Sequence, residues 1–347
     1  MKVVVAMSGG VDSSVVAGLM AREGHEVIGV TLQLYDHGAA TSRKGACCAG
    51  QDIHDARRVA DKLGIAHYVV DSEVRFRQSV ISAFADSYAG GQTPVPCIAC
   101  NQHLKFGDLL EMARDLGAEA LATGHYVRRI EGADGAEMHK AVDATRDQSW
   151  FLFATTREQL EFCRFPLGHY ASKAEVRALA VEMGLAVAEK PDSQDICFVP
   201  SGSYADVVEK YRPDALEDGE IVTEDGRVLG AHQGIARYTI GQAKRLPNAA
   251  AHMVVKKIEP GTKRIIVGPR GVQSAKVQLR AVNWLTAPRE LRAGVKLRAR
   301  DEVRPVRIIP QAREEAVLLL DEPALAAPGQ AAVFYEGERV LGGGFIV

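Results

Sequence analysis

The stretch MSGGVDSS, residues 7–14, joins an apolar run at residues 3–6 to a segment of helical character at 13–22. A glycine-rich turn between a strand and a helix is a natural anion site, because free backbone N–H groups and the helix dipole both favour negative charge. The turn lacks the lysine of a Walker-type triphosphate loop and carries Asp12 instead. We expect Asp12 to be a solvent-facing carboxylate of this loop. An anion bound here therefore needs a positively charged partner that compensates Asp12.

The first 200 residues alternate between strand-like and helix-like segments. The pattern predicts strands at 3–7, 26–34, 67–70 and 118–123, and helices at 13–22, 51–63, 101–116 and 173–183. Such alternation predicts an α/β domain with a parallel sheet and helices on both faces. Sites in these sheets lie at the carboxyl ends of the strands, where the glycine-rich turn falls.

The pattern changes after about residue 200. Short, β-branched and turn-separated stretches predict strands at 277–282, 295–300, 306–309, 316–320, 331–335 and 340–347. Six such strands fit a small barrel or sandwich. We therefore expect three domains: an α/β domain at 1–200, a small mixed or β domain at 201–270, and a C-terminal β-barrel at 271–347.

Charge and cysteine content narrow the class of protein. Residues 251–313 contain fifteen Lys/Arg and four Asp/Glu, a net charge of +11, although the whole chain carries only −2. A basic module on an acidic remainder predicts contact with nucleic acid. No apolar run is long enough for a membrane span, and the start is too short for a signal peptide. Six cysteines without a secretion signal indicate a reducing, cytoplasmic location.

The string Ser8-Gly9-Gly10-Val11-Asp12-Ser13 resembles the pyrophosphate loop of the ATP pyrophosphatases. In that superfamily the loop grips the β- and γ-phosphates of ATP while a substrate oxygen attacks the α-phosphate. The resemblance implies that Asp12 faces a Mg²⁺ ion bridging the phosphates, so that its charge is compensated. ATP and Mg²⁺ are thus the expected ligands of the turn.

Further motifs resemble, in the same order, those of the tRNA-specific 2-thiouridylases. They are TPVPCIACN (93–101) followed by KF (105–106), ATGHY (122–126), DQSWFL (147–152), DSQDICFV (192–199), YTIGQ (238–242) and PGQAAVFYEG…LGGG (328–344). Members of this family transfer sulfur to the 2-position of the wobble uridine, position 34, of lysine, glutamate and glutamine tRNAs. The resemblance implies a tRNA partner, a sulfur-donor protein, and ATP consumption to AMP and pyrophosphate.

The resemblance also implies roles for single residues. Cys197 would carry a persulfide, Cys100 would complete the transfer and leave a transient Cys100–Cys197 disulfide, and Asp12 would act with the nucleotide. The implied nucleotide contacts are Ala6, Met7, Ser8, Gly9, Gly10, Val11, Asp12, Ser13, Leu32 and Gly124; the implied tRNA contacts are Val95, Pro96, Cys97, His125, Arg146, Asp147, Gln148 and Gln330. Val95, Ala243 and Arg245 depart from the family pattern, which has Asn, Arg and Gly there.

The cysteines permit other chemistry. Cys97 and Cys100 form a C-x-x-C pair, but no second such pair follows at zinc spacing, and Cys47 and Cys48 are too close together to chelate well. Cys97, Cys100 and Cys197 could instead hold an iron–sulfur cluster, which needs all three, whereas a persulfide scheme has no fixed need for Cys97. Cys100 precedes the helix expected near Asn101, a position that favours a reactive thiolate. Cys163 is expected to be a buried core cysteine.

Two other functions are compatible with the phosphate loop. One is an amidotransferase-type synthetase of the same superfamily, although the chain has no glutaminase signature. The other is a non-catalytic RNA-binding protein with a relic nucleotide loop, although Asp12, Cys100 and Cys197 are all present.

Overall fold

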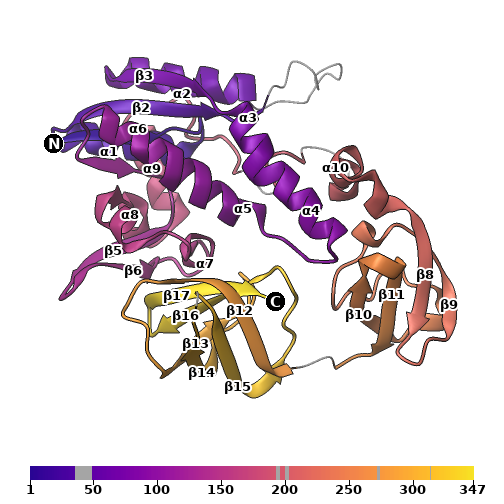
Figure 1. Ribbon diagram of the computed structural model, residues 1–347. Helices are drawn as coiled ribbons and strands as arrows, with labels where there is room; N and C mark the ends of the chain where they lie inside the picture. The colour runs from indigo at the N-terminus through magenta and orange to yellow at the C-terminus, as the bar shows by residue number, and fades with distance from the viewer. Residues whose placement is uncertain (36–48, 193–195, 200–202, 272–273, 313) are drawn as a thin grey trace. The chain divides into compact units, whose positions relative to one another are not determined.

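The computed structural model describes residues 1–35, 49–192, 196–199, 203–271, 274–312 and 314–347. Cys47, Cys48, the Ser193–Asp195 part of one motif, and Arg313 lie outside the described residues. The chain divides into two compact units: Met1–Ser79, Cys97–Pro200 and Gly337–Leu341 form the first, and Val80–Pro96, Ser201–Glu336 and Gly342–Val347 form the second. Figure 1 shows the elements of both along the chain.

The first unit is built on a five-stranded sheet with the order β3-β2-β1-β4-β7, parallel throughout. Its strands are β1 Lys2–Ala6, β2 Glu26–Gln33, β3 Ala66–Asp71, β4 Ala120–Ala122 and β7 Cys163–Arg164. Val5 pairs with Gly29 of β2 on one side and with Ala122 of β4 on the other. The strand order reverses between β1 and β4, and the turn at residues 8–10 leaves β1 at this switch point. The predicted parallel α/β domain is confirmed.

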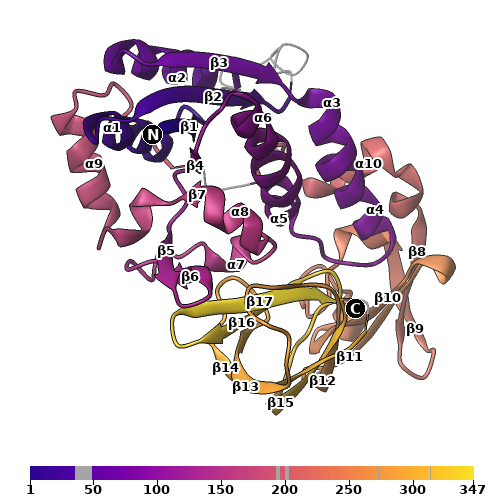
Figure 2. The same ribbon diagram turned by 60° about the vertical axis from the view of Figure 1, so that its left-hand side comes forward.

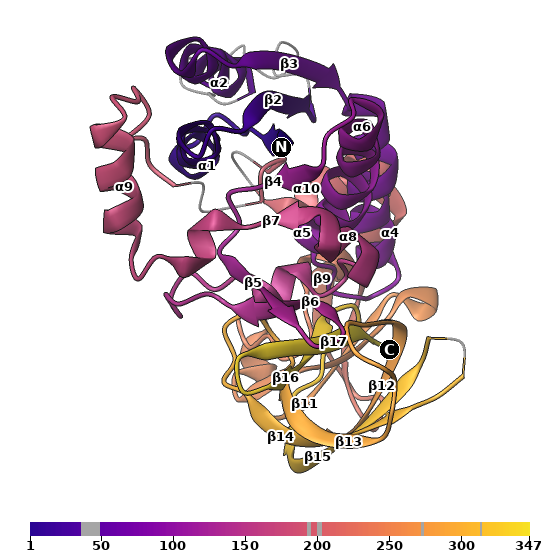
Figure 3. The same cartoon turned by 90° about the vertical axis from the view of Figure 1, so that its left-hand side faces the viewer.

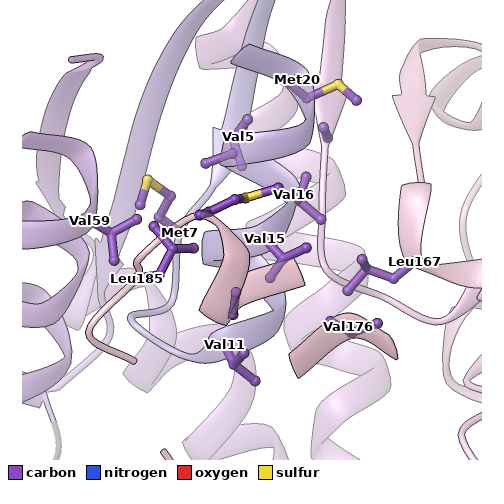
Figure 4. Packing of buried hydrophobic residues seen from close by; sticks show 14 of the residues in the cluster. Val5, Met7, Val11, Val15, Val16, Met20, Val59, Leu167, Val176 and Leu185 are labelled. Carbon is purple, nitrogen blue, oxygen red and sulfur yellow. The ribbon is translucent and has the colours of Figure 1, made fainter. Parts of the chain in front are cut away.

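Helices cover both faces of this sheet (Figure 3). The main ones are α1 Val11–Arg22, α2 Ala49–Leu63, α6 Leu109–Asp115 and α9 Lys173–Glu182. α1 contacts both α2 and α9, whereas α6 packs on β1 and β4. α1 is buried on nearly all sides: Val11, Val15, Val16 and Met20 pack with Val5, Met7, Val59, Leu167, Val176 and Leu185 (Figure 4). The start of α1, and with it the turn, is thereby held rigidly against β1.

Smaller elements complete the first unit. They are α3 Glu73–Phe76, η1 Arg77–Ser82 (which runs on into the second unit), α5 Pro96–Ala99, η2 Cys100–Asp108, β5 Val127–Gly132, β6 Gly135–Lys140, α7 Ser149–Leu152, α8 Arg157–Phe162 and η3 Pro166–His169. The prediction of one helix from Asn101 is wrong at its start. Pro96 begins the helix, the backbone is π-helical through η2, and α6 follows directly. Proline suits a first helical position because its missing N–H would be unpaired there anyway.

The second unit contains a mixed four-stranded sheet and a closed barrel (Figure 2). The sheet has the order β10-β11-β8-β9, from β8 Asp218–Thr223, β9 Val228–Gln233, β10 Met253–Glu259 and β11 Arg264–Pro269. Its core includes Ile221, Tyr238, Val255 and Ile265, and it extends to Ala327 of the barrel segment. Residues 80–96 belong to this unit because α4 Ala83–Ala89 packs on α10 Tyr204–Tyr211, where Tyr88 stacks on Tyr204 at 4.9 Å.

Six strands form the barrel in the order β12-β15-β14-β13-β16-β17, closed by a β12–β17 pairing. They are β12 Ser274–Trp284, β13 Leu291–Lys296, β14 Arg304–Pro310, β15 Ala316–Ala324, β16 Ala331–Glu336 and β17 Arg339–Ile346. The predicted C-terminal barrel is confirmed, but the predicted strand 295–300 is wrong in its second half. Val295 pairs with Arg304, so residues 297–303 form the connection to β14 and carry Arg298 and Arg300 on a turn. None of the helices in the described part of the chain is long and apolar enough to cross a membrane.

Gly9 is the one position of the turn where only glycine fits. Its φ is +73°, and a Cβ built on it would lie 2.1 Å from the carbonyl oxygen of Asp52 in α2. We expect Gly9→Ala to lower the free energy of unfolding by about 2–5 kcal/mol, from left-handed strain and the backbone clash together. Urea denaturation measures this.

Gly64 provides the matched control. Its φ is +68°, but a Cβ there would meet nothing within 4 Å. Gly64→Ala should therefore cost only the strain, about 1–2 kcal/mol. Equal losses in the two variants would show that the close approach of the turn to α2 does not matter.

Candidate active site

The turn between β1 and α1 is held by its own serines. The hydroxyl of Ser13 accepts a hydrogen bond from the Ser8 N–H at 3.1 Å, and the Ser14 hydroxyl donates to the Gly10 carbonyl at 2.8 Å. Both serines are buried. Within the described residues no side chain caps the first turn of α1. Its leading N–H groups are therefore available to an anion, as the sequence predicts.

A pocket of about 680 Å³ opens beside this turn in the first unit. Of the predicted site residues, those that line it are Ala6, Met7, Ser8, Gly10, Val11, Asp12, Ser13, Leu32, Cys100, Gly124, His125, Arg146, Gln148 and Cys197. Gly124, after β4, approaches the start of α1 so closely that a Cβ on it would lie 3.0 Å from Ser13 N. The pocket therefore brings together the phosphate loop and two of the three candidate cysteines.

The expectation that Asp12 is a solvent-facing loop carboxylate is wrong, because its side chain is paired with Lys173 and Tyr126. Asp12 lies in the first turn of α1, and both its oxygens are 2.6 Å from Nζ of Lys173 on α9. The Tyr126 hydroxyl donates to Oδ1 of Asp12 at 2.7 Å. Lys173 is only 9% exposed and lies 3.1 Å from Asp192 as well. Asp12 thus compensates the buried ammonium group of Lys173. Nothing in the local sequence indicates that Lys173 lies there.

Asp192 also lines the pocket and pairs with three cationic side chains. Its carboxylate lies 2.6 Å from Arg146, 3.1 Å from Lys173 and 3.2 Å from Arg177. Burial raises the pKa of Asp192, but the hydrogen bonds and charges of Lys173 and Arg146 outweigh it, so the pKa falls below its usual range. The carboxylate is therefore ionised and ties the segment that leads to Cys197 to Lys173.

Lys190 connects the same segment to the phosphate loop. Its Nζ donates to the Gly9 carbonyl at 3.0 Å and to Asp52 and Asp55 of α2 at 2.6 Å each. Burial opposes the charge of Lys190, but the two carboxylates raise its pKa overall. Sequence reasoning missed Lys190, Lys173 and Tyr126. Tyr126 is part of the motif at 122–126 and Lys190 lies two residues before the motif at 192–199, whereas nothing local marks Lys173.

His125 faces the pocket as a neutral imidazole. Its Nε2 lies 3.3 Å from the Lys105 ammonium and its Nδ1 lies 2.8 Å from the Thr123 hydroxyl. Burial, and then the charge of Lys105, lower the pKa of His125 well below its usual value. Because an ammonium can only donate, Nε2 accepts and the ring proton is on Nδ1.

The predicted trio 146–148 has three different environments. Arg146 pairs with Asp192, and the side-chain carbonyl of Gln148 accepts from the Tyr126 N–H at 2.9 Å. Asp147 does not line the pocket; its carboxylate accepts from the Ser149 hydroxyl at 2.8 Å and from the backbone N–H groups of Ser149 and Ala141. Asp147 therefore organises the turn before α7.

Cys100 and Cys197 line the pocket, whereas Cys97, on α5, does not. Cys100 is 8% exposed and Cys197 is exposed. The expectation that Cys100 precedes a helix is wrong, because α5 and η2 are continuous and Cys100 lies inside the helix. Burial raises the pKa of Cys100. Desolvation, followed by the charges of Cys100 and Cys97, raises the pKa of Cys197 to about 12.

The described residues do not fit a resident metal. Among them, no three His, Cys, Asp or Glu side chains form a group that could hold an ion, and this holds for Cys97, Cys100 and Cys197 as well. The three cysteines therefore do not form an iron–sulfur site in this arrangement. For Mg²⁺, three carboxylates line the pocket, those of Asp12, Asp52 and Asp192. Each is ion-paired with a lysine: Asp12 and Asp192 with Lys173, and Asp52 with Lys190.

The remaining predicted contacts belong to the second unit. Val95 is half-buried, Pro96 is buried at the start of α5, and the Gln330 amide donates to the Thr93 carbonyl at 2.9 Å. Gln330 lines a second pocket of about 330 Å³ with Thr93, Gly241, Gln242 and Arg298. Arg245, where the family pattern has Gly, adopts a φ of +65°. Glycine fits this left-handed backbone better, which explains the family preference.

Family models match most of the chain. They are described as the tRNA methyl transferase HUP domain at residues 1–201, the tRNA methyl transferase PRC-barrel domain at 205–269, and the aminomethyltransferase beta-barrel domain at 274–346.

Curated relatives match over the full length. The tRNA-specific 2-thiouridylase MnmA of Acidiphilium cryptum is 69% identical, with 100% of both chains covered. The proteins of the same name from Gluconobacter oxydans and Rhodospirillum centenum are 62% and 57% identical. Both matches cover 100% of this chain, and they cover 99% and 91% of the respective relatives. Among solved structures, a 4-thiouridine synthetase–RNA complex with bound ATP is only weakly similar: TM-score 0.35, 17% identity, 61% of this chain and 50% of that chain.

The Asp12–Lys173 pair can be tested on the protein alone. We expect a double-mutant cycle of Asp12→Asn and Lys173→Gln, followed by urea denaturation, to give a coupling free energy of about 1–3 kcal/mol, because the lysine is buried. The exposed pair Arg22–Glu182, at 2.8 Å, is the control. Its Gln/Gln cycle should give less than about 1 kcal/mol. Equal coupling in the two cycles would contradict the role given to Asp12.

Proposed function

Because this chain belongs to the tRNA-specific 2-thiouridylase family, we propose that it transfers sulfur, with consumption of ATP, to the C2 position of the wobble uridine, position 34, in lysine, glutamate and glutamine tRNAs. The observation that carries the proposal is the shared pocket. It is lined by the phosphate loop and by both cysteines that a persulfide transfer needs. Adenylation and sulfur delivery can therefore act on one uracil carbonyl.

The first step is activation. The C2 oxygen of uracil is a poor leaving group and must first be activated. It attacks the α-phosphate of ATP, pyrophosphate leaves, and the oxygen can then depart as part of AMP. The N–H groups at the start of α1 hold the phosphates, and Lys190 fixes the turn through the Gly9 carbonyl. Mg²⁺ would enter on the phosphates of ATP, since no three His, Cys, Asp or Glu side chains of the described residues form a group that could hold an ion.

The second step is sulfur transfer. The outer sulfur of a persulfide on Cys197 attacks C2 and AMP leaves. The Cys100 thiolate then attacks the inner sulfur, the persulfide S–S bond breaks, and sulfur stays on C2 while a Cys100–Cys197 disulfide forms. Cys197 is exposed, so a persulfide-bearing donor protein can reach it, whereas Cys100 is buried and meets only what is already in the pocket.

One assay separates this proposal from its two rivals. A sulfurtransferase releases AMP from ATP only with tRNA present and then yields 2-thiouridine. A synthetase that uses ammonia would release AMP but form no thiouridine, and a non-catalytic RNA-binding protein would release no AMP. Asp12→Asn should abolish AMP release, because the loop loses its charge pairing with Lys173. Normal AMP release by this variant would contradict the role of Asp12.

The two cysteines should separate the two steps. We expect Cys100→Ser and Cys197→Ser each to abolish thiolation but to retain adenylation, because neither thiol takes part in the attack on ATP. Transfer of label from α-³²P-ATP to tRNA measures adenylation, and nucleoside mass spectrometry measures 2-thiouridine. Mass spectrometry of the intact protein should place added sulfur on Cys197.

Cys163→Ala is the control, because Cys163 is buried in β7 away from the pocket. Thiolation by either serine variant would contradict the persulfide scheme. Stoichiometric iron in anaerobically purified protein, required for thiolation, would replace that scheme with a cluster.

The basic segment at residues 251–313 should contribute to tRNA binding through exposed arginines. Arg300 is exposed on the turn after β13 and has no ion pair among the described residues. Arg307 is exposed but pairs with Glu290, and Nε of Arg304 is buried. We expect Arg300→Gln to flatten the plot of log K against log salt concentration by about 0.7–0.9, the value for one lost phosphate contact.

Arg22→Gln removes an exposed charge from α1 in the first unit and serves as the matched control. It should leave the salt slope unchanged. If Arg300→Gln behaves like this control, the barrel turn is not part of the tRNA platform.

A further inference from the structure

Cys97 is a thiol that the proposed reaction leaves unused. It is exposed on α5, three residues before Cys100, and α5 continues into η2 without a break. Residues three apart on a helix lie on one face with Cβ atoms about 5–6 Å apart. A small adjustment of the backbone brings such a pair to disulfide distance, as C-x-x-C pairs require.

The third thiol, Cys197, lines the same pocket as Cys100. Cys97 lies outside that pocket but one helical turn from Cys100. The charges of Cys100 and Cys97 also raise the pKa of Cys197, after desolvation. Cys100 is therefore the residue that connects the other two, because it shares a pocket with Cys197 and a helix with Cys97.

The proposed reaction leaves a Cys100–Cys197 disulfide after every turnover. While Cys197 is bonded to Cys100 it cannot accept another sulfur. Of the two sulfur atoms in this bond, that of Cys197 is exposed to a reductant in solution, whereas Cys100 is only 8% exposed and is reached from within the protein. Cys97, exposed and on the same helix, has access to both Cys100 and the solvent.

We propose that Cys97 is the resolving thiol of this enzyme, which passes the disulfide from the carrier to the C-x-x-C pair. The Cys97 thiolate attacks the sulfur of Cys100, a Cys97–Cys100 bond forms, the Cys100–Cys197 bond breaks, and Cys197 leaves as a thiolate that takes up a proton. A dithiol reductant of the thioredoxin class then attacks the exposed Cys97 sulfur and supplies two electrons and two protons. The inference rests on the proposed sulfur transfer.

Attack on Cys100 rather than on Cys197 follows from chain connectivity. Cys97 and Cys100 are joined by two residues of one helix, so the closing ring is short and the effective concentration of the attacking thiol is high. The product also frees Cys197, the exposed residue that must be loaded again. Attack on Cys197 would instead leave the carrier blocked.

Trapping the disulfide tests the proposal directly. Protein loaded with persulfide on Cys197 is mixed with ATP and tRNA without reductant, quenched with an alkylating reagent, and mapped by mass spectrometry. Wild type should show a Cys97–Cys100 disulfide and an alkylated Cys197. Cys97→Ser should retain a Cys100–Cys197 disulfide. A wild-type protein with a Cys100–Cys197 disulfide and an alkylated Cys97 would overturn the proposal.

Turnover gives a second measurement. With a thioredoxin-class reductant, the ratio of the steady-state rate to the first-turnover rate should fall at least tenfold in Cys97→Ser. Ala99→Ser, on the same helical turn, is the matched control and should keep the wild-type ratio. An unchanged ratio in Cys97→Ser would overturn the proposal. Failure of the proposed function itself looks different, because wild type would then form neither thiouridine nor any disulfide.

Discussion

The buried ammonium of Lys173 is the constraint on which the site depends. A buried lysine must be paired, and here Asp12 and Asp192 pair with it from opposite directions of the chain. One carboxylate starts α1 at the phosphate loop; the other begins the segment that reaches Cys197. Lys190 repeats the connection through the Gly9 carbonyl and α2. The turn at residues 8–10 and the pocket wall that carries Lys190 and Asp192 are therefore parts of one ion-paired structure, although about 180 residues separate them.

This arrangement explains how an aspartate can stand in an anion-binding turn. The negative charge of Asp12 is cancelled by Lys173, so the field at the start of α1 comes from its backbone N–H groups. The cation that a Walker-type loop carries in its own sequence is supplied here by distant elements. The turn itself can then remain small, with Gly9 in direct contact with α2 and Gly124 against Ser13. Lys173 and Lys190, which lie far from the turn in the sequence, therefore stand in for the lysine that a Walker-type loop contains.

Local sequence patterns predicted the elements but not the pairs between them. The apolar run before Ser8 and the alternation of segments were enough for the parallel sheet, because a strand buried on both faces is apolar throughout. The apolar pattern places the helix start near Asn101, although Pro96 marks the true start. The same kind of pattern extends a strand over residues 297–300, because only the pairing with β14 shows that β13 ends at Lys296. Lys173 could not be predicted to meet Asp12, since no periodicity connects residues 161 apart. The roles of the site residues stay predictions.

The charge of Lys105 acts on all three thiols. It lowers the pKa of Cys97, Cys100 and Cys197 against the desolvation that raises each of them. A Cys97 thiolate in turn raises the pKa of the other two, so the three thiols do not ionise independently of one another. Once Cys100 and Cys197 are bonded to each other, neither can carry a charge, and Lys105 acts on Cys97 alone. The same cation that favours a thiolate for sulfur transfer therefore favours, after the transfer, a thiolate on the residue best placed to undo the disulfide.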